Sequence, residues 1–145
     1  MEFRPAVVVH YKNGDIRKGY TKNFAFFRNT FDLTEVDSKT EQEMQATQVR
    51  VEDLKAVFFV KNFNGKPDYH PGPNSVPERY GFGDRLEITF MDNETMIGYT
   101  HRYRENNNGF ILYPADPKVN NDLVAVIRSA TQAITPEQKH SFFYL

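Results

Sequence analysis

One stretch of this chain occurs twice, and this repeat constrains the fold more than any other feature. Residues 7–21 and 86–100 match at a spacing of 79 positions, and both end in Gly-Tyr-Thr. The match continues without a gap to Phe31-Asp32-Leu33 in the first copy and Phe110-Ile111-Leu112 in the second, a span of 27 positions. The 145 residues therefore predict two copies of one small unit.

Each copy begins with a pattern typical of a β-hairpin. Residues 7–11 are β-branched and aromatic, and residues 86–90 alternate so that Leu86, Ile88 and Phe90 share one face. By the same register, Val7, Val9 and Tyr11 face a core. Asn13-Gly14 predicts a two-residue type I′ turn before a second strand at 16–21, and Asp92-Asn93 takes that place in the second copy.

Gly19 and Gly98 fall late in the second strand of each copy, where glycine indicates a bulge, a sharp bend or a close approach of another backbone. Third strands are expected at 30–33 and 109–112, with Phe31 and Phe110 inward. Residues 34–48 are polar and acidic, and predict a loop or a turn of helix. A short strand, a 3₁₀ turn and a last strand are expected over 49–60, and again over 123–134.

These elements predict a mainly β protein made of two tandem five-stranded barrels. The expected divisions are 1–61 for the first barrel, 62–83 for a Pro/Gly-rich linker, 84–134 for the second barrel and 135–145 for a C-terminal tail. The tail begins Thr135-Pro136-Glu137-Gln138, a pattern typical of a capped helix start, so we expect a short helix there.

The order of the expected elements resembles that of small SH3-like and Sm-like barrels. The Gly-Tyr-Thr triplets, residues 54–60 and the Pro114-Ala115-Asp116-Pro117 segment look like an uncharacterised bacterial domain family of unknown function. The Sm resemblance would imply RNA binding and ring assembly. However, residues 23–29 and 52–55 lack the loop patterns that Sm proteins carry at those positions, and fold alone does not determine function.

Composition excludes several chemistries. The chain has no cysteine, which excludes disulfides, thiolate metal sites and a cysteine nucleophile. No window approaches the roughly 18 apolar residues of a membrane span, and the first residues do not form a signal peptide, so we expect a cytoplasmic protein without a membrane partner. The net charge of −1 is uneven: residues 1–31 hold six basic and two acidic side chains, and residues 32–53 hold two and seven.

The sequence contains no recognisable set of catalytic residues. The four histidines (His10, His70, His101 and His140) show no metal-ligand spacing, and the chain has no nucleophile elbow, P-loop or dinucleotide-binding glycine motif. We therefore expect a protein that is not an enzyme and that has no cofactor and no metal.

The candidate binding surface combines basic and aromatic side chains of the first copy, a combination that can bind single-stranded nucleic acid by stacking and phosphate contact. Its residues are Lys12, Arg17, Lys18, Lys22, Phe24, Phe27 and Arg28. The alternative is that the aromatic residues belong to the core and the charges are solvated.

Three functions remain open at this stage. The first is a non-enzymatic binding or adaptor module with a protein partner, the second is a single-stranded nucleic-acid binder, and the third is a small-molecule sensor between the two units. Unpaired strand edges also allow a homo-oligomer.

Overall fold

The computed structural model describes residues 4–37, 39–64, 83–101, 107–114 and 119–136. The first half of the chain contains β1 (Ala6–Tyr11), β2 (Ile16–Tyr20), β3 (Thr30–Val36), β4 (Glu43–Arg50), the 3₁₀ turn η1 (Val51–Asp53) and β5 (Leu54–Val60). The second half contains β6 (Asp84–Phe90), β7 (Thr95–Thr100), β8 (Gly109–Pro114), β9 (Asn121–Ile127), η2 (Arg128–Ala130) and β10 (Thr131–Pro136). The prediction of a mainly β protein is confirmed.

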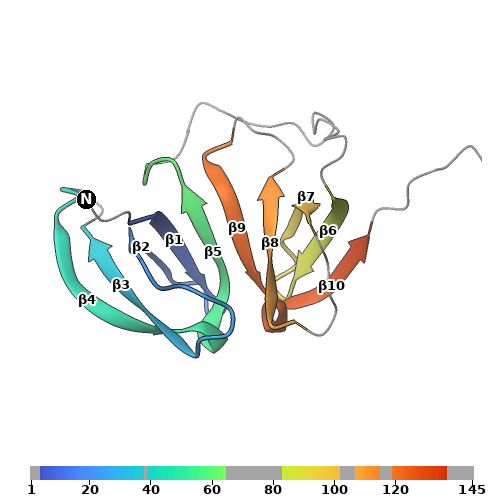
Figure 1. Ribbon diagram of the computed structural model, residues 1–145, viewed down its shortest axis with the longest axis horizontal. Coiled ribbons are helices and arrows are strands. Elements are labelled where there is room, and N and C mark those ends of the chain that lie inside the picture. Colours follow the sequence, from blue (N-terminus) through green and yellow to red (C-terminus); the bar gives the residue numbers. More distant parts are fainter. Residues whose placement is uncertain (1–3, 38, 65–82, 102–106, 115–118, 137–145) are drawn as a thin grey trace, which may run out of the picture.

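The ten strands of the described residues belong to one antiparallel sheet, in the order β10-β6-β7-β8-β9-β5-β1-β2-β3-β4. The strands of the first half therefore follow the order β5-β1-β2-β3-β4, and those of the second half follow the same order, β10-β6-β7-β8-β9. The halves meet where β5 pairs with β9, from Ala56 opposite Val126 to Val60 opposite Asn121 (Figure 1).

The sheet is not closed into a barrel, which corrects the expectation of two tandem five-stranded barrels. The physical reason is the pairing of β5. Its free edge forms hydrogen bonds with β9 of the other half rather than with β4 of its own half, so β4 and β10 are left as the two ends of the sheet.

β5 and β9 bury both of their faces, and this creates two cores. In β5, Leu54 and Val57 pack into a first core, whereas Ala56 and Phe58 pack into a second core. The first core is Val7, Val9, Phe31, Leu33, Val49, Val51, Leu54, Val57, Ala125 and Ile127. The second core is Ala56, Phe58, Val60, Leu86, Ile88, Phe90, Phe110, Leu112, Val124, Val126 and Ala130. Each core thus contains side chains from both halves, so the halves are not independent in their packing.

The inward residues expected from alternation are buried. Val7, Val9, Ile88 and Phe90 are fully buried, and Tyr11 lies partly buried against the first core. Burial of this kind contributes about 1.5–3 kcal/mol for each large apolar side chain.

Both expected hairpins form, but the type I′ prediction for the first turn is wrong. Gly14 has a φ of +97° while Asn13 is not in the left-handed region, and the amide of Gly14 donates to the carbonyl of Tyr11 at 3.1 Å. The loop is four residues long, so only one position needs a positive φ. Asn93 takes that position in the second half with a φ of +70°, and asparagine is one of the few other residues that tolerate it.

Gly19 and Gly98 mark close backbone crossings, one of the alternatives predicted for them. A Cβ at Gly19 would lie 2.3 Å from the carbonyl oxygen of Thr34, and one at Gly98 would lie 2.6 Å from that of Tyr113. β2 and β3 pair only next to this crossing, at two positions. Any larger residue would push the third strand of that half away.

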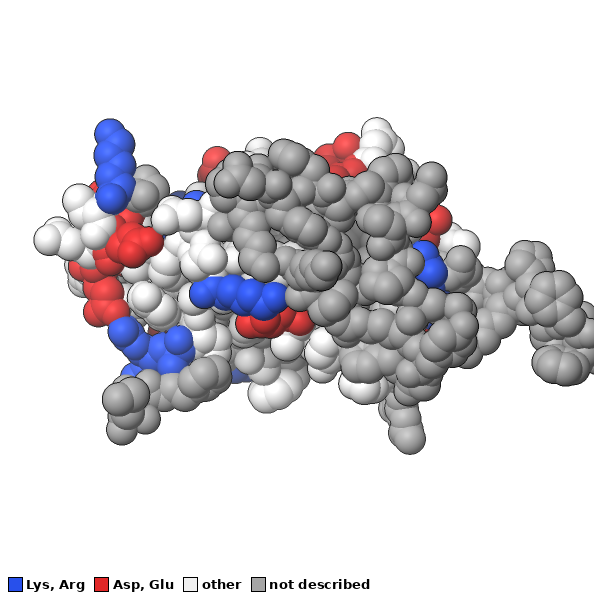
Figure 2. All heavy atoms as spheres, turned by 90° about the horizontal axis from the view of Figure 1, so that it is seen from above, with Lys and Arg blue, Asp and Glu red and all other residues white. Residues whose placement is uncertain are grey.

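The acidic segment 34–48 does not form a loop or a helix over most of its length. β3 extends to Val36 and β4 begins at Glu43, because the polar side chains suit a strand at the solvated end of the sheet. Its acids pair with basic residues of the first half: Arg4 forms an ion pair with Glu43, and Arg17 lies 3.9 Å from Glu35. Figure 2 shows this mixing of positive and negative side chains on one face.

At the C-terminal end, Thr135 and Pro136 are part of β10 and do not start a helix, which corrects that prediction. They pair with Glu87 and Leu86 of β6, so sheet pairing prevails over the local capping signal. The rest of the expected helix and most of the expected linker lie outside the described residues, and the proposed domain boundaries stay a prediction.

Candidate functional site

The seven residues of the predicted binding surface do not form one surface. Arg17 pairs with Val9 and Lys18 pairs with Val8, so their side chains leave opposite faces of β2. The guanidinium of Arg17 lies over the ring of Tyr11 at 5.2 Å, and the ammonium of Lys18 donates to the carbonyl of Phe63 at 2.8 Å.

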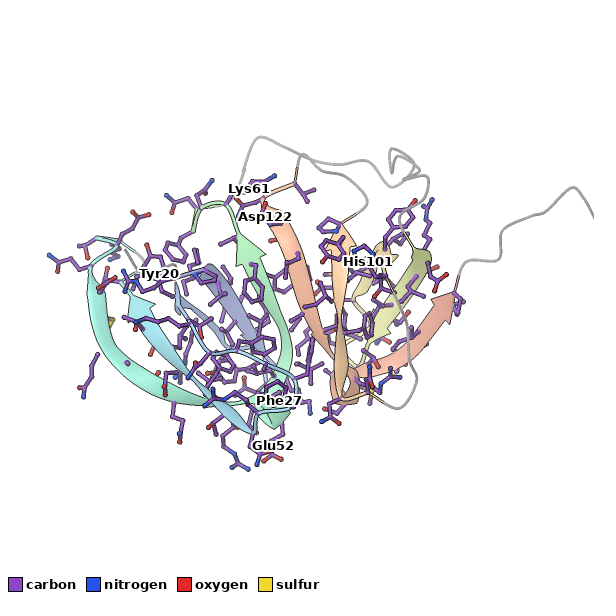
Figure 3. The ribbon with its side chains drawn as sticks, in the orientation of Figure 1. Tyr20, Phe27, Glu52, Lys61, His101 and Asp122 are labelled. Carbon is purple, nitrogen blue, oxygen red and sulfur yellow. The ribbon has the colours of Figure 1, made fainter. Side chains whose placement is uncertain are left out.

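The aromatic members also separate. Phe24 packs on the first core, with edge-to-face contacts to Phe26, Phe31 and Phe59, so it is a packing residue. Phe27 is 86% exposed and lies at the same end of the molecule as Glu52 (Figure 3).

Lys22 lines a smaller hollow of about 400 Å³ in the first half. Arg4 and Tyr20 also line it, with the guanidinium of Arg4 stacked over the ring at 4.6 Å. Arg28 and Lys12 lie elsewhere, beside the larger hollow of the structure.

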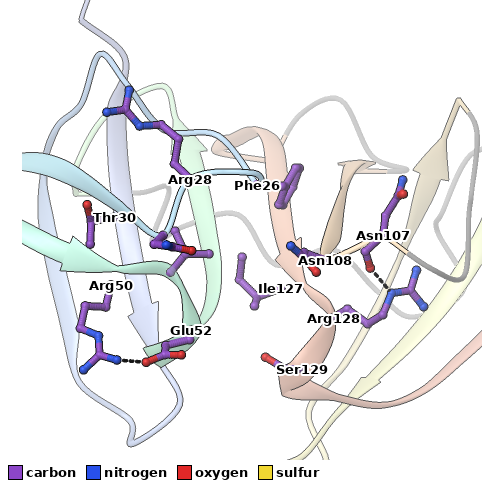
Figure 4. A pocket seen from close by; sticks show the side chains of 12 residues that line it. Phe26, Arg28, Thr30, Arg50, Glu52, Asn107, Asn108, Ile127, Arg128 and Ser129 are labelled. Atoms are coloured by element: carbon purple, nitrogen blue, oxygen red, sulfur yellow. Dashed lines mark hydrogen bonds and ion pairs between the residues drawn. The ribbon is translucent and has the colours of Figure 1, made fainter.

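That larger hollow, which we call the junction hollow, has a volume of about 690 Å³ and lies where η1 and η2 face each other across the two halves (Figure 4). Phe26, Val51 and Ile127 supply its apolar walls. Its full lining is Phe26, Arg28, Asn29, Thr30, Arg50, Val51, Glu52, Asn107, Asn108, Ile127, Arg128 and Ser129.

Equivalent positions of the two halves shape the junction hollow. The carbonyl of Asn29 accepts a hydrogen bond of 2.9 Å from the amide of Val51, which starts η1. The carbonyl of Asn108, 79 positions later, accepts one of 2.9 Å from the amide of Arg128, which starts η2. These bonds fix both turns against the strands β3 and β8, so the hollow is preformed.

One difference between the halves opens space for an aromatic wall. Gly109 occupies the position of Thr30, and a Cβ there would lie 2.5 Å from the ring of Phe26. The absence of a side chain on β8 therefore lets Phe26 of the first half pack against the second half.

Lys12 connects the two turns beside the junction hollow. Its ammonium donates to the carbonyl of Glu52 at 2.6 Å and to the hydroxyl of Ser129 at 2.7 Å. Lys12, one of the predicted binding residues, thus bridges η1 and η2 in the structure.

The charges around the junction hollow are three arginines and one glutamate. Arg50 forms an ion pair with Glu52, and the Nε of Arg128 donates to the carbonyl of Asn107 at 2.5 Å. In the part of the chain that the structure describes, the side chain of Arg28 makes no hydrogen bond or ion pair, so its donors are available to a ligand.

A second polar cluster joins the halves through Lys55, which we call the Lys55 clamp. The ammonium of Lys55 donates to Asp92 Oδ2 and to Glu94 Oε2, each at 2.8 Å, and lies 4.8 Å from the ring centre of Phe90. Burial lowers the pKa of Lys55, but the hydrogen bonds and charges of the two carboxylates outweigh it and raise the pKa above 10.5. The hydrogen bond from Lys55 lowers the pKa of Asp92 below 3.8.

His10 lies next to the Lys55 clamp, with its ring 4.5 Å from that of Phe58. Burial, and then the positive charge of Lys55, lower the pKa of His10 from 6.5, while Glu94 and Asp92 act in the opposite direction. The histidine is therefore neutral at pH 7.

The described ranges contain no group of three or more His, Asp or Glu side chains placed to hold a metal ion. Within the same ranges, no helix is long and apolar enough to cross a membrane.

The junction hollow was not identified from the sequence, apart from Arg28 at its rim. One signal could have indicated it: Asn29 and Asn108 occupy the same position of the repeat, and each precedes a third strand. The turns at 52–54 and 127–129 were recognised, but nothing in the sequence showed that they face each other.

The fold and this site define an all-β protein whose two halves share one sheet and together line an open hollow at their junction. The chain belongs to a family of unknown function, DUF6982, whose match covers residues 4–136. No curated protein and no solved structure matches the chain.

Proposed function

We propose that this protein is a non-enzymatic binding module and that its ligand is a small molecule held in the junction hollow. The observation that carries the proposal is the hollow itself, which is formed by residues of both halves and has a volume of about 690 Å³. Ligand pockets typically measure about 300–1,000 Å³ and combine apolar walls with a few polar groups.

The rigidity of the junction supports the same proposal. β5 and β9 are hydrogen bonded to each other, which holds the halves together, and the amides of Val51 and Arg128 donate to the carbonyls of Asn29 and Asn108, which holds the two turns of the wall in place. A preformed site binds more tightly because less conformational freedom is lost on binding.

The identical strand order of the halves supports a further part of the proposal, that the chain arose from two copies of one SH3-like unit. In this view the ligand site is a product of joining the copies, because one unit alone would supply only one of the two turns.

A screen of small molecules tests the proposed function. Ligand-observed NMR would be run with a fragment library on the wild-type chain and on Asn108→Trp, whose indole would occupy the junction hollow. Asn108 is exposed and its φ is not positive, so the larger side chain can be accommodated without backbone strain. Gln45→Trp on β4, also exposed, is the matched control.

We expect fragments that bind the wild type and the control but not Asn108→Trp. If no fragment binds, or if all binding persists in Asn108→Trp, the proposal is wrong.

The second candidate is a protein partner, which the 86% exposure of Phe27 favours. Aromatic side chains of this kind often anchor interfaces. A selection from a random peptide library tests it: enriched peptides that no longer bind Phe27→Ser would support this candidate, and enrichment that is unaffected by the substitution would contradict it.

A further inference from the structure

We infer that the chain associates with further copies of itself, head to tail, through β10 of one copy and β4 of the next. The inference goes beyond the proposed ligand site and starts from the strand pairing. Within the described residues, no strand pairs with the outer edge of β4 or of β10, and Figure 1 shows these two strands on opposite sides of the molecule. Unpaired edges of this kind can accept a further strand.

The registers of the two halves show which strands correspond. In the first half, Val9 of β1 lies opposite Val57 of β5. In the second half, Ile88 of β6 lies opposite Ile134 of β10, at the same positions of the repeat. The pairings of β3 with β4 and of β8 with β9 agree in the same way. β10 is therefore the counterpart of β5, and β4 is the counterpart of β9.

The free edges are the counterparts of the two strands that join the halves. Within one chain, the last strand of the first half, β5, pairs with the fourth strand of the second half, β9. β10 is also a last strand and β4 is also a fourth strand, and both have a free edge. A second copy can thus repeat, between β10 and β4, the pairing that already joins the halves.

This repetition also predicts the register between copies. At the internal junction, three successive residues of β5 lie opposite three of β9: Ala56 opposite Val126, Val57 opposite Ala125 and Phe58 opposite Val124. The counterparts in β10 and β4 would then be paired as follows: Ala133 opposite Val49, Ile134 opposite Gln48 and Thr135 opposite Thr47.

The side chains of β10 suit a neighbouring strand. Ala133 is exposed, whereas its counterpart Ala56 is fully buried beside β9, so a small side chain is present where the next copy would pack. β10 also carries no charged side chain, although charges on an edge strand are a common device against pairing. Nothing in this strand therefore repels β4 of another copy.

The contact between copies is weaker than the internal junction. Gln48 and Thr47 of β4 take the positions of Ala125 and Val124, which are buried in β9. Pro136 ends β10 and has no backbone N–H to donate. Because the two copies use different strands, each added copy leaves one free edge of each kind, so association continues beyond a dimer.

Cysteine cross-linking of the full chain tests the inference, because the chain has no cysteine of its own. Thr47→Cys and Thr135→Cys would be purified separately, mixed and oxidised. Residues directly opposite each other in antiparallel strands have Cβ atoms about 4.5–5.5 Å apart, close to the separation in a disulfide. Thr95→Cys mixed with Thr135→Cys is the matched control, since Thr95 is exposed on β7, an interior strand of the sheet.

The disulfide between Thr47→Cys and Thr135→Cys should form at least about tenfold faster than that of the control pair, because pairing raises the effective concentration of the thiols. Equal rates for the two pairs would overturn the inference. Faster coupling of Thr47→Cys with itself would also overturn it, because that result means a symmetric contact between two β4 strands.

Sedimentation velocity of the unmodified chain gives a second measurement. The average mass should rise with concentration between about 10 µM and about 1 mM and pass that of a dimer. Ala133→Lys should abolish this rise, because it would bury an ammonium against the next copy, whereas Thr95→Lys should leave it unchanged. A mass that stays at that of the monomer, or a rise that persists in Ala133→Lys, would show that β10 and β4 do not pair between copies.

Discussion

Replacing Lys55 by methionine removes the charge of the Lys55 clamp and keeps a side chain of similar length. The ammonium bridges the halves, since Lys55 belongs to β5 and its partners Asp92 and Glu94 belong to the β6–β7 turn. Lys55 itself is 7% exposed. The substitution therefore tests whether this polar contact stabilises the joined sheet.

The expected loss of stability follows from the exposure of the three groups. Hydrogen bonds to charged groups contribute about 1.5–3 kcal/mol, and exposed ion pairs about 0.2–1 kcal/mol. The carboxylates of Asp92 and Glu94 are 52% and 59% exposed, so water can solvate them once the ammonium is gone. Methionine also recovers some apolar burial. We therefore expect Lys55→Met to lower the free energy of unfolding by about 1–2 kcal/mol.

Urea unfolding at pH 7 measures this difference. The complementary double variant Asp92→Asn/Glu94→Gln should destabilise the chain more than Lys55→Met, because it leaves a buried ammonium without a counter-charge. Equal or smaller destabilisation by the double variant would refute the reasoning.

The pH dependence gives a second test. The pKa of Lys55 is raised, so its stabilisation is complete below pH 10.5 and is lost as the pH rises through the folded-state value. The pKa of Asp92 is lowered, so its stabilisation is complete above pH 3.8 and is lost as the pH falls. The stability difference between the wild type and Lys55→Met should therefore be constant between pH 6.5 and pH 10.5. It should shrink above this range as Lys55 loses its proton, and below it as His10 and then Asp92 take up protons.

The pKa of His10 gives a test of the Lys55 clamp that an NMR titration can measure directly. Its lowered pKa means that the unfolded chain takes up a proton first as the pH falls below 6.5, so the wild type should lose stability there. Lys55→Met removes a charge that lowers this pKa and leaves two carboxylates that raise it. An NMR titration should show a higher pKa for His10 in the variant; an unchanged or lower value would mean that Lys55 acts through packing alone.

Three further predictions follow from the packing. The wild type should unfold in a single cooperative transition in urea, because β5 and β9 belong to both cores; two separate transitions would contradict this. Phe58→Ala should cost about 3–5 kcal/mol in the same assay, since its buried ring packs in the second core, and a loss below about 1 kcal/mol would be inconsistent with that burial. Gly109→Ala should cost about 1–3 kcal/mol, because its Cβ would lie 2.4 Å from the carbonyl oxygen of Val126 and would displace Phe26; an unchanged melting temperature would show that β8 can shift freely.

Much of the local structure could be predicted from the sequence. Alternation identified the inward faces of the first and third strands, for example Ile88 and Phe90, because the side-chain period of a strand is two wherever one face is buried. The doubled glycines indicated a bulge, a sharp bend or a close approach of another backbone. The structure shows the close approach, since only a residue without a Cβ fits at 2.3–2.6 Å from a carbonyl. Of the seven proposed surface residues, Arg28 lines the junction hollow and the other six do not, and whether the seven bind a ligand stays a prediction.

A comparison of equivalent strands explains why the joining of the halves was missed. β9 reads NDLVAVI and is buried on both faces toward its end, whereas β4, at the same place in the first half, reads EMQATQVR and is mostly exposed. The nearly continuous apolar runs of β5 and β9 are typical of strands covered on both sides. The polar faces of β4 and β10 are suited to the solvated ends of a sheet.

The sequence by itself thus determined most of the strands, their inward faces and the same succession of elements in the two halves, because these depend on periodicity and on residues a few positions apart. Tertiary structure alone decided that β5 pairs with β9. Any free strand edge can accept a neighbouring strand, and which strand it accepts depends on which apolar faces are buried together. That one pairing opens the sheet, divides its interior into two cores, and brings Asn29 and Asn108 to opposite sides of one hollow.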